Sequence, residues 1–148
     1  GLTPRDNIRR IRDSALFFSK HFDESQENLL LYGNTGVGKT FLTHCIAKEA
    51  LDRSHTVVYL TSPGLFDILE KNKFDRELSS VEKSAVATYI LNCDLLIIDD
   101  LGTELNNSFT SSQLYQVIDS RLVHQKSTII STNLSFDDLR EQYSERIF

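Results

Sequence analysis

The eight residues GNTGVGKT, at positions 33–40, constrain this chain more than any other part of its sequence. A glycine, four further residues and then Gly-Lys-Thr form a pattern that should arise by chance in well under about one sequence in a hundred of this length. The apolar run NLLLYG, which starts at Asn28, precedes it, and a helical pattern from Lys39 to about Asp52 follows. A strand, a glycine loop and a helix are therefore expected, which is the context in which such a loop cradles phosphate groups.

Each position of this loop has a chemical reason. Glycines let successive backbone N–H groups turn inward onto phosphate oxygens, and the following helix adds its positive amino end. Lys39 is expected to reach the β- and γ-phosphates of ATP, and Thr40 to offer its hydroxyl to Mg²⁺. A glycine-rich turn without function is the alternative. The predicted ATP-binding residues of the loop are Gly33, Asn34, Thr35, Gly36, Val37, Gly38, Lys39, Thr40 and Phe41.

Two consecutive acids, Asp99 and Asp100, follow a continuous apolar run that begins at Leu95. Such a run is typical of a strand buried on both faces of a parallel sheet. Asp99 would then lie at the carboxyl edge of the sheet, where ligands of open α/β folds collect, and is predicted to hold Mg²⁺ by way of water. Asp100 should point to the opposite face and orient or deprotonate the attacking water. A solvated strand end is the alternative for both acids.

The rest of the chain alternates between strand and helix patterns. Strands are expected at 56–61 and 127–133, and helices at 63–71, 76–91, 110–124 and from the capping residue Ser135 through Leu139. In 110–124 the apolar positions are Leu114, Val117, Ile118 and Leu122, and in 76–91 they are Leu78, Val81, Ala85, Tyr89 and Ile90. Alternating strands and helices demand right-handed crossovers, so the fold class is α/β with a parallel sheet covered by helices on both sides.

The bulk composition predicts one globular domain, with 148 residues of which 40% are hydrophobic and 25% charged. Residues 1–27 are expected to form a short approach helix and 28–148 the core. A net charge of −5 disfavours a broad nucleic-acid surface as the dominant feature. No apolar run approaches the ~18 residues of a membrane span and no signal peptide is evident, so a cytoplasmic location is expected. Cys45 and Cys93 are expected to be small buried hydrophobes.

These residues together resemble the AAA+ ATPases, and more narrowly the bacterial replicative helicase loaders of the DnaC/DnaI type. The similar segments are GNTGVGKT (33–40), LLIIDDLGTE (95–104), QLYQVIDSRL (113–122), TIISTNLS (128–135) and YSERIF (143–148). The resemblance implies a three-layer P-loop sandwich and an ATPase of the primosome that acts in DNA replication. Its implied partners are a replicative DNA helicase and further copies of itself, with single-stranded DNA as a further candidate and no membrane.

The resemblance also implies roles for particular residues. The strand at 127–133 would lie between the loop strand and the Asp99 strand, and Asn133 at its tip would sense the γ-phosphate, although asparagine also favours turns after strands. Arg146 would act in trans as an arginine finger, and Asn7 and Ile8 would lie near the adenine. The family's fifth strand and its second sensor arginine would come after Phe148, so the domain is expected to be incomplete at its carboxyl end.

Three alternative functions stay open at this point. The transposition ATPases of the IstB type share most of these motifs, although an Asp-Asp pair at 99–100 favours a loader. A nucleotide-gated scaffold would bind ATP and a partner with little turnover. A small-molecule P-loop kinase is disfavoured because the arginine-rich lid typical of such enzymes is lacking. In the initiator and loader branch the region 63–91 can approach single-stranded DNA, but its mixed charges more simply indicate a solvated face.

Overall fold

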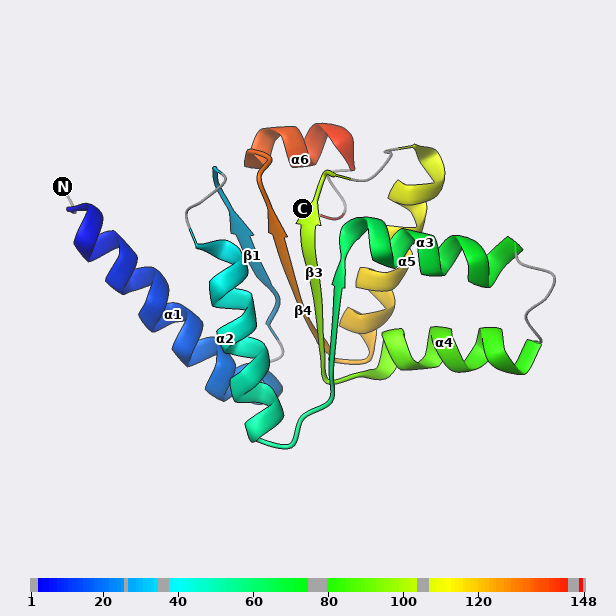
Figure 1. Ribbon diagram of the computed structural model, residues 1–148, viewed down its shortest axis with the longest axis horizontal. Coiled ribbons are helices and arrows are strands. Elements are labelled where there is room, and N and C mark those ends of the chain that lie inside the picture. The colour runs from blue at the N-terminus through cyan, green and yellow to red at the C-terminus, as the bar shows by residue number, and fades with distance from the viewer. Residues whose placement is uncertain are drawn as a thin grey trace.

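The computed structural model describes residues 3–25, 27–34, 38–74, 80–103, 107–143 and 147. Its sheet has four parallel strands, β1 (Leu29–Tyr32), β2 (Val57–Thr61), β3 (Leu95–Leu101) and β4 (Ser127–Thr132). They lie in the order β1-β4-β3-β2, as Figure 1 shows. The last strand in sequence is therefore inserted between the first and the third, which confirms the expected arrangement.

Helices cover both faces of this sheet and make three layers (Figure 1). α1 (Pro4–Ser25) and α2 (Lys39–Asp52) pack on one face. The other face is covered by α3 (Ser62–Phe74), α4 (Ser80–Asn92) and α5 (Ser108–Val123), while α6 (Phe136–Gln142) lies toward the carboxyl ends of the strands. None of the described helices is long and apolar enough to cross a membrane.

The strict alternation of side chains along the central strands separates two cores. Leu95 and Ile97 of β3 belong to the cluster with α1 and α2, whereas Leu96 and Ile98 belong to the cluster with α3, α5 and α6. All four side chains have 0% exposure, so β3 is buried on both faces as predicted. Where a strand stays regular, the same alternation decides which face a polar residue near its end occupies.

The first helix is longer than the short approach helix expected from the sequence. It runs for 22 residues, and Thr3 caps its amino end by accepting a hydrogen bond from the backbone N–H of Asp6 at 3.1 Å. Ala15, Phe18 and Phe22 form a buried stripe at helical spacing in its second half. The polar first half hides this periodicity, which is why the length was underestimated.

Three expectations about burial were wrong. In α5 Arg121 is fully buried, whereas Leu122, expected on the apolar face, is 50% exposed. In α4 Val81 and Tyr89 are 77% and 63% exposed, so its apolar positions do not all face the core. Cys45 is exposed, while Cys93 is buried as expected, and burial raises the pKa of the Cys93 thiol even though Arg121 lies beside it.

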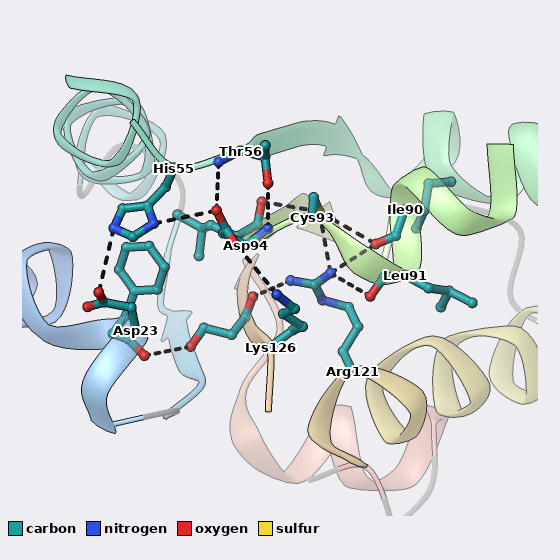
Figure 2. A network of polar contacts seen from close by, with 12 residues as sticks. Asp23, His55, Thr56, Ile90, Leu91, Cys93, Asp94, Arg121 and Lys126 are labelled. Atoms are coloured by element: carbon teal, nitrogen blue, oxygen red, sulfur yellow. Dashed lines mark hydrogen bonds and ion pairs between the residues drawn. The ribbon is translucent and has the colours of Figure 1, made fainter. Parts of the chain in front are cut away.

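The buried Arg121 ties three elements together at the amino edge of the sheet (Figure 2). Its Nη1 donates to the backbone oxygens of Ile90 at 2.9 Å and Leu91 at 3.2 Å, in the last turn of α4, and to the Cys93 sulfur at 3.3 Å. Its Nη2 donates to the Ser127 oxygen at 2.7 Å, and its Nε donates to the Thr128 hydroxyl at 2.9 Å. The side chain thus caps α4 and fixes the start of β4.

Asp94 is the second centre of this network. Its carboxylate accepts from the Thr56 N–H at 3.0 Å and from the Lys126 ammonium at 3.4 Å, while its own N–H donates to the Thr56 hydroxyl at 2.8 Å. The His55 ring lies between this carboxylate and that of Asp23 (Figure 2). Burial alone would raise the pKa of Asp94, but the bonds from Thr56, Lys126 and His55 outweigh it and lower the pKa.

Candidate nucleotide site

The glycine loop leaves β1 and opens α2 as the sequence predicts. Gly33 and Gly38 have φ angles of 140° and 92°, which favour glycine because a Cβ atom is strained there. The Lys39 ammonium donates to the backbone oxygens of Gly33 at 2.7 Å and Asn34 at 2.8 Å. Thr35, Gly36 and Val37 lie outside the described residues. The lysine is therefore held over the loop by neutral carbonyls, which a phosphate can replace.

Asp99 lies at the carboxyl end of β3, only 4% exposed, and its carboxylate faces α2. Its Oδ2 accepts from the Tyr59 hydroxyl at 2.6 Å and lies 3.4 Å from the Thr40 hydroxyl. Its Oδ1 accepts from the Ser131 hydroxyl. Side chains two residues apart along a strand share a face, so Tyr59 of β2, Asp99 of β3 and Ser131 of β4 all continue the α2 side of the sheet.

The backbone departs from regular strand geometry at Asp100. Its φ angle is 59°, and the pairing of β3 with β4 shifts between Ile98 and Leu101, so Asp99 and Asp100 together oppose Ser131. This is a β-bulge, a feature that often re-aims side chains next to active sites. Regular alternation therefore fails between Ile98 and Leu101, and the predicted direction of the Asp100 side chain stays a prediction. The Asp100 N–H donates to the Ser131 hydroxyl at 3.2 Å.

Two hydroxyl residues behind Asp99 were missed by sequence reasoning. Tyr59 is held against Thr43 of α2, with 3.1 Å between the two hydroxyl oxygens. Burial, together with the bond to Asp99, raises the pKa of Tyr59 to about 12, so its hydroxyl stays protonated and donates. Both residues had an ordinary place in a strand or helix pattern, and only the pairing of β2 with β3 brings Tyr59 to the acid. A tyrosine in an otherwise aliphatic strand was the available signal.

The other predicted site residues are exposed where the structure describes them. Asn133 directly follows β4 and is exposed. Phe41, in the first turn of α2, is 72% exposed, and Ile8, in the amino half of α1, is 67% exposed. Arg146 lies outside the described residues. The structure thus brings Lys39, Thr40, Asp99 and Asp100 to one edge of the sheet, with Asn133 at the end of the neighbouring strand.

The lysines of α3 that could meet DNA are exposed and make contacts to neighbouring side chains. Lys71 forms an ion pair with Asp67 at 3.2 Å, and the Lys73 ammonium lies 5.4 Å from the centre of the Phe109 ring. These contacts favour the solvated mixed face expected from the sequence over a nucleic-acid surface in this helix.

A strand order in which β4 separates the phosphate-loop strand from the acid-bearing strand belongs to the AAA+ class of P-loop ATP-binding domains. Within this class, residues 7–147 match the family described as IstB-like ATP binding protein, and the chain belongs to that family.

Several known proteins are similar to this chain. It is 30% identical over 142 residues to the insertion sequence IS232 putative ATP-binding protein of Bacillus thuringiensis subsp. berliner, covering 96% of this chain and 53% of that protein. It is 25% identical over 130 residues to the replicative helicase loader DnaC of Escherichia coli (strain K12), covering 88% of this chain and 52% of DnaC. The chain therefore spans about half the length of these curated relatives.

The comparison with solved structures gives the same result as the comparison of sequences. The crystal structure of the DnaC helicase loader superimposes with a TM-score of 0.79 and 25% sequence identity. The match covers 99% of this chain and 84% of that one. Every described strand and helix therefore falls within a fold that a helicase loader shares.

Proposed function

We propose that this domain binds ATP with Mg²⁺ between the glycine loop and Asp99, and hydrolyses it. The observation that carries the proposal is the approach of the Thr40 hydroxyl, from the first turn of α2, to the Asp99 carboxylate at 3.4 Å. Both groups offer hard oxygen atoms, which Mg²⁺ prefers. When bound, Mg²⁺ would neutralise charge that develops on the phosphate oxygens. Lys39 exchanges its loop carbonyls for the β- and γ-phosphates.

Asp100 and Asn133 supply the remaining roles. A carboxylate next to the site can accept a proton from the attacking water while the water oxygen bonds to the γ-phosphorus and the bond to ADP breaks. The φ angle of 59° at Asp100 supports this role, since strained backbone clusters at active sites. Asn133, at the end of β4, orients the water or the γ-phosphate through its amide.

Replacing Asp100 with alanine tests this assignment. ATP affinity should stay within about threefold of the wild type, while phosphate release should fall by ~10²–10⁴, the range for loss of a general base. Binding of a fluorescent ATP analogue and single-turnover phosphate release measure the two effects. Asp119→Ala, an exposed acid of α5, is the matched control and should change neither. Undiminished hydrolysis in Asp100→Ala would exclude Asp100 as the base.

Arg146 is proposed to complete the site of a neighbouring copy. An arginine supplied in trans can raise turnover in P-loop enzymes by ~10³–10⁵, so an isolated copy should bind ATP and hydrolyse it slowly. The segment YSERIF (143–148), which contains Arg146 and carries part of the resemblance to the loaders, supports this role. ATP at this site would then report assembly as well as supply energy.

For the whole protein we propose the role of a helicase loader that acts on a replicative DNA helicase. The similarity to DnaC in sequence and in structure supports it. A second candidate, an ATP-binding protein of transposition, is favoured by the higher identity to the IS232 protein. A pulldown of the gene product that carries this sequence distinguishes the two. ATP-dependent capture of the replicative helicase is expected, and capture of a transposase alone would overturn the proposal.

A further inference from the structure

We propose that Tyr59 is a positioning residue for the Asp99 carboxylate, and that its hydroxyl sets how strongly Mg²⁺ couples to ATP binding. The inference rests on the proposed ATP site. Tyr59 comes from β2, an edge strand that contributes no residue to the predicted site. Its hydroxyl nevertheless lies 2.6 Å from the carboxylate oxygen that also faces Thr40.

The two contacts to this oxygen differ in strength. At 2.6 Å the Tyr59 bond has the length of a charge-assisted O–H···O⁻ hydrogen bond, whereas the 3.4 Å contact from Thr40 is long and weak. Tyr59 therefore fixes the direction of the carboxylate while the Thr40 hydroxyl can turn to a cation. An ionised carboxylate can accept about four hydrogen bonds, so the bonds from Tyr59 and Ser131 leave capacity for a metal-bound water.

Tyr59 is in turn fixed to the helix that follows the glycine loop. Its single hydroxyl hydrogen goes to Asp99, so toward Thr43 its oxygen can only accept, with 3.1 Å between the two hydroxyl oxygens. The Thr43 hydroxyl, on a side chain with 0% exposure, donates to the backbone oxygen of Thr40 at 2.7 Å and shares this hydrogen with the Tyr59 oxygen. The His44 ring packs edge-on against the Tyr59 ring, with 4.9 Å between the ring centroids. The first turn of α2 and the acid of β3 are thus connected through one phenol.

This connection has a consequence for the metal. Groups that orient a metal-binding carboxylate through hydrogen bonds typically change metal affinity or activity by about 10–100-fold when they are removed. A phenol that only filled space in the core would not affect the metal. The Mg²⁺ dependence of nucleotide binding therefore separates a positioning role from a structural one.

The test measures the affinity for a fluorescent ATP analogue over a range of Mg²⁺ concentrations, for the wild type, Tyr59→Phe and Tyr115→Phe. Tyr115, a half-exposed tyrosine of α5, is the matched control. In EDTA all three should bind with the same affinity within about twofold. The Mg²⁺ concentration for the half-maximal gain in affinity should rise about tenfold in Tyr59→Phe alone.

The outcomes are distinguishable. A Tyr59→Phe protein with the Mg²⁺ dependence of the wild type would overturn the role of Tyr59 and leave the ATP site intact. A wild type without any gain in affinity from Mg²⁺ would instead contradict the proposed site itself. If Tyr59→Phe fails to fold, Thr43→Val decides, since it removes the bond that fixes the phenol but keeps the phenol. A shift smaller than tenfold in the same direction is then expected, and no shift overturns the proposal.

Discussion

Polar networks lie at both ends of the parallel strands, which form the amino edge and the carboxyl edge of the sheet. The two networks use similar chemical groups but differ in how tightly these groups are bonded within the protein. At the amino edge Arg121 is fully buried and donates to five protein acceptors at 2.7–3.3 Å. At the carboxyl edge Lys39 is held by two loop carbonyls, Thr40 reaches Asp99 only at 3.4 Å and Asp100 adopts a φ angle of 59°. The donors of Arg121 are therefore used within the protein, whereas the carboxyl edge contains strained backbone and contacts that a ligand can replace.

This difference separates residues that maintain the fold from residues available to a ligand. A buried donor that satisfies carbonyl groups stabilises the protein, because unpaired buried carbonyls are costly. Strained backbone and weak contacts persist at functional sites, where they lower the stability of the fold but serve activity. Substitutions at the amino edge should therefore change stability alone, and those at the carboxyl edge should change nucleotide binding or hydrolysis first.

Arg121→Leu should have the largest effect on stability. It removes the arginine donor from the backbone oxygens of Ile90, Leu91 and Ser127, and a buried group left without a donor costs ~1–3 kcal/mol. A loss of roughly 3–5 kcal/mol in the free energy of unfolding is expected. Urea unfolding measures it, with Arg9→Leu, an exposed arginine of α1, as the control. A loss below about 1 kcal/mol, the size of an ordinary surface effect, would contradict the structural role.

Asp94→Asn, in the same network, should have a smaller and pH-dependent effect. The fold lowers the Asp94 pKa below its ordinary value of 3.8, so its contribution is present above that pH and disappears as the pH falls through the folded-state pKa. The side chain is 35% exposed, so solvent screening limits the contribution to about 1 kcal/mol.

The measurement is the difference in unfolding free energy between the wild type and Asp94→Asn at pH 6 and near pH 3. These two pH values lie on either side of the ordinary aspartate pKa of about 4. The wild type should be the more stable at the higher pH, and the gap should narrow at the lower one. A gap that stays constant or widens toward low pH would show that the lowered pKa of Asp94 does not stabilise the fold.

Local patterns predicted much of this fold and part of its site. The glycine loop, the buried strand that carries Asp99 and the helices at 39–52 and 110–124 all carry signals within a short window. The strand and both helices are present, and so are the strand before the loop and the helix after it. The inserted position of β4 came from resemblance to known ATPases and is also present. A role that follows from a single segment of the chain could therefore be predicted from the sequence.

Roles that depend on two segments could not be found in this way. Tyr59 meets Asp99 only because β2 pairs with β3, and Ser131 meets it only because β4 lies on the other side. The bulge at Asp100 arises from the pairing with β4 and has no local pattern. Arg121 was overlooked because a helical pattern counts apolar residues, whereas here an arginine is buried by satisfying carbonyls of another helix.

The central claim is that the carboxyl edge binds ATP through the glycine loop, and one measurement tests it directly. Mg-ATP at a hundred times its dissociation constant should stabilise the wild type by ~2.7 kcal/mol, whereas Lys39→Ala should show no binding and no stabilisation. Lys48→Ala, an exposed lysine of the same helix, should behave as the wild type. Unchanged ATP affinity in Lys39→Ala would contradict the account.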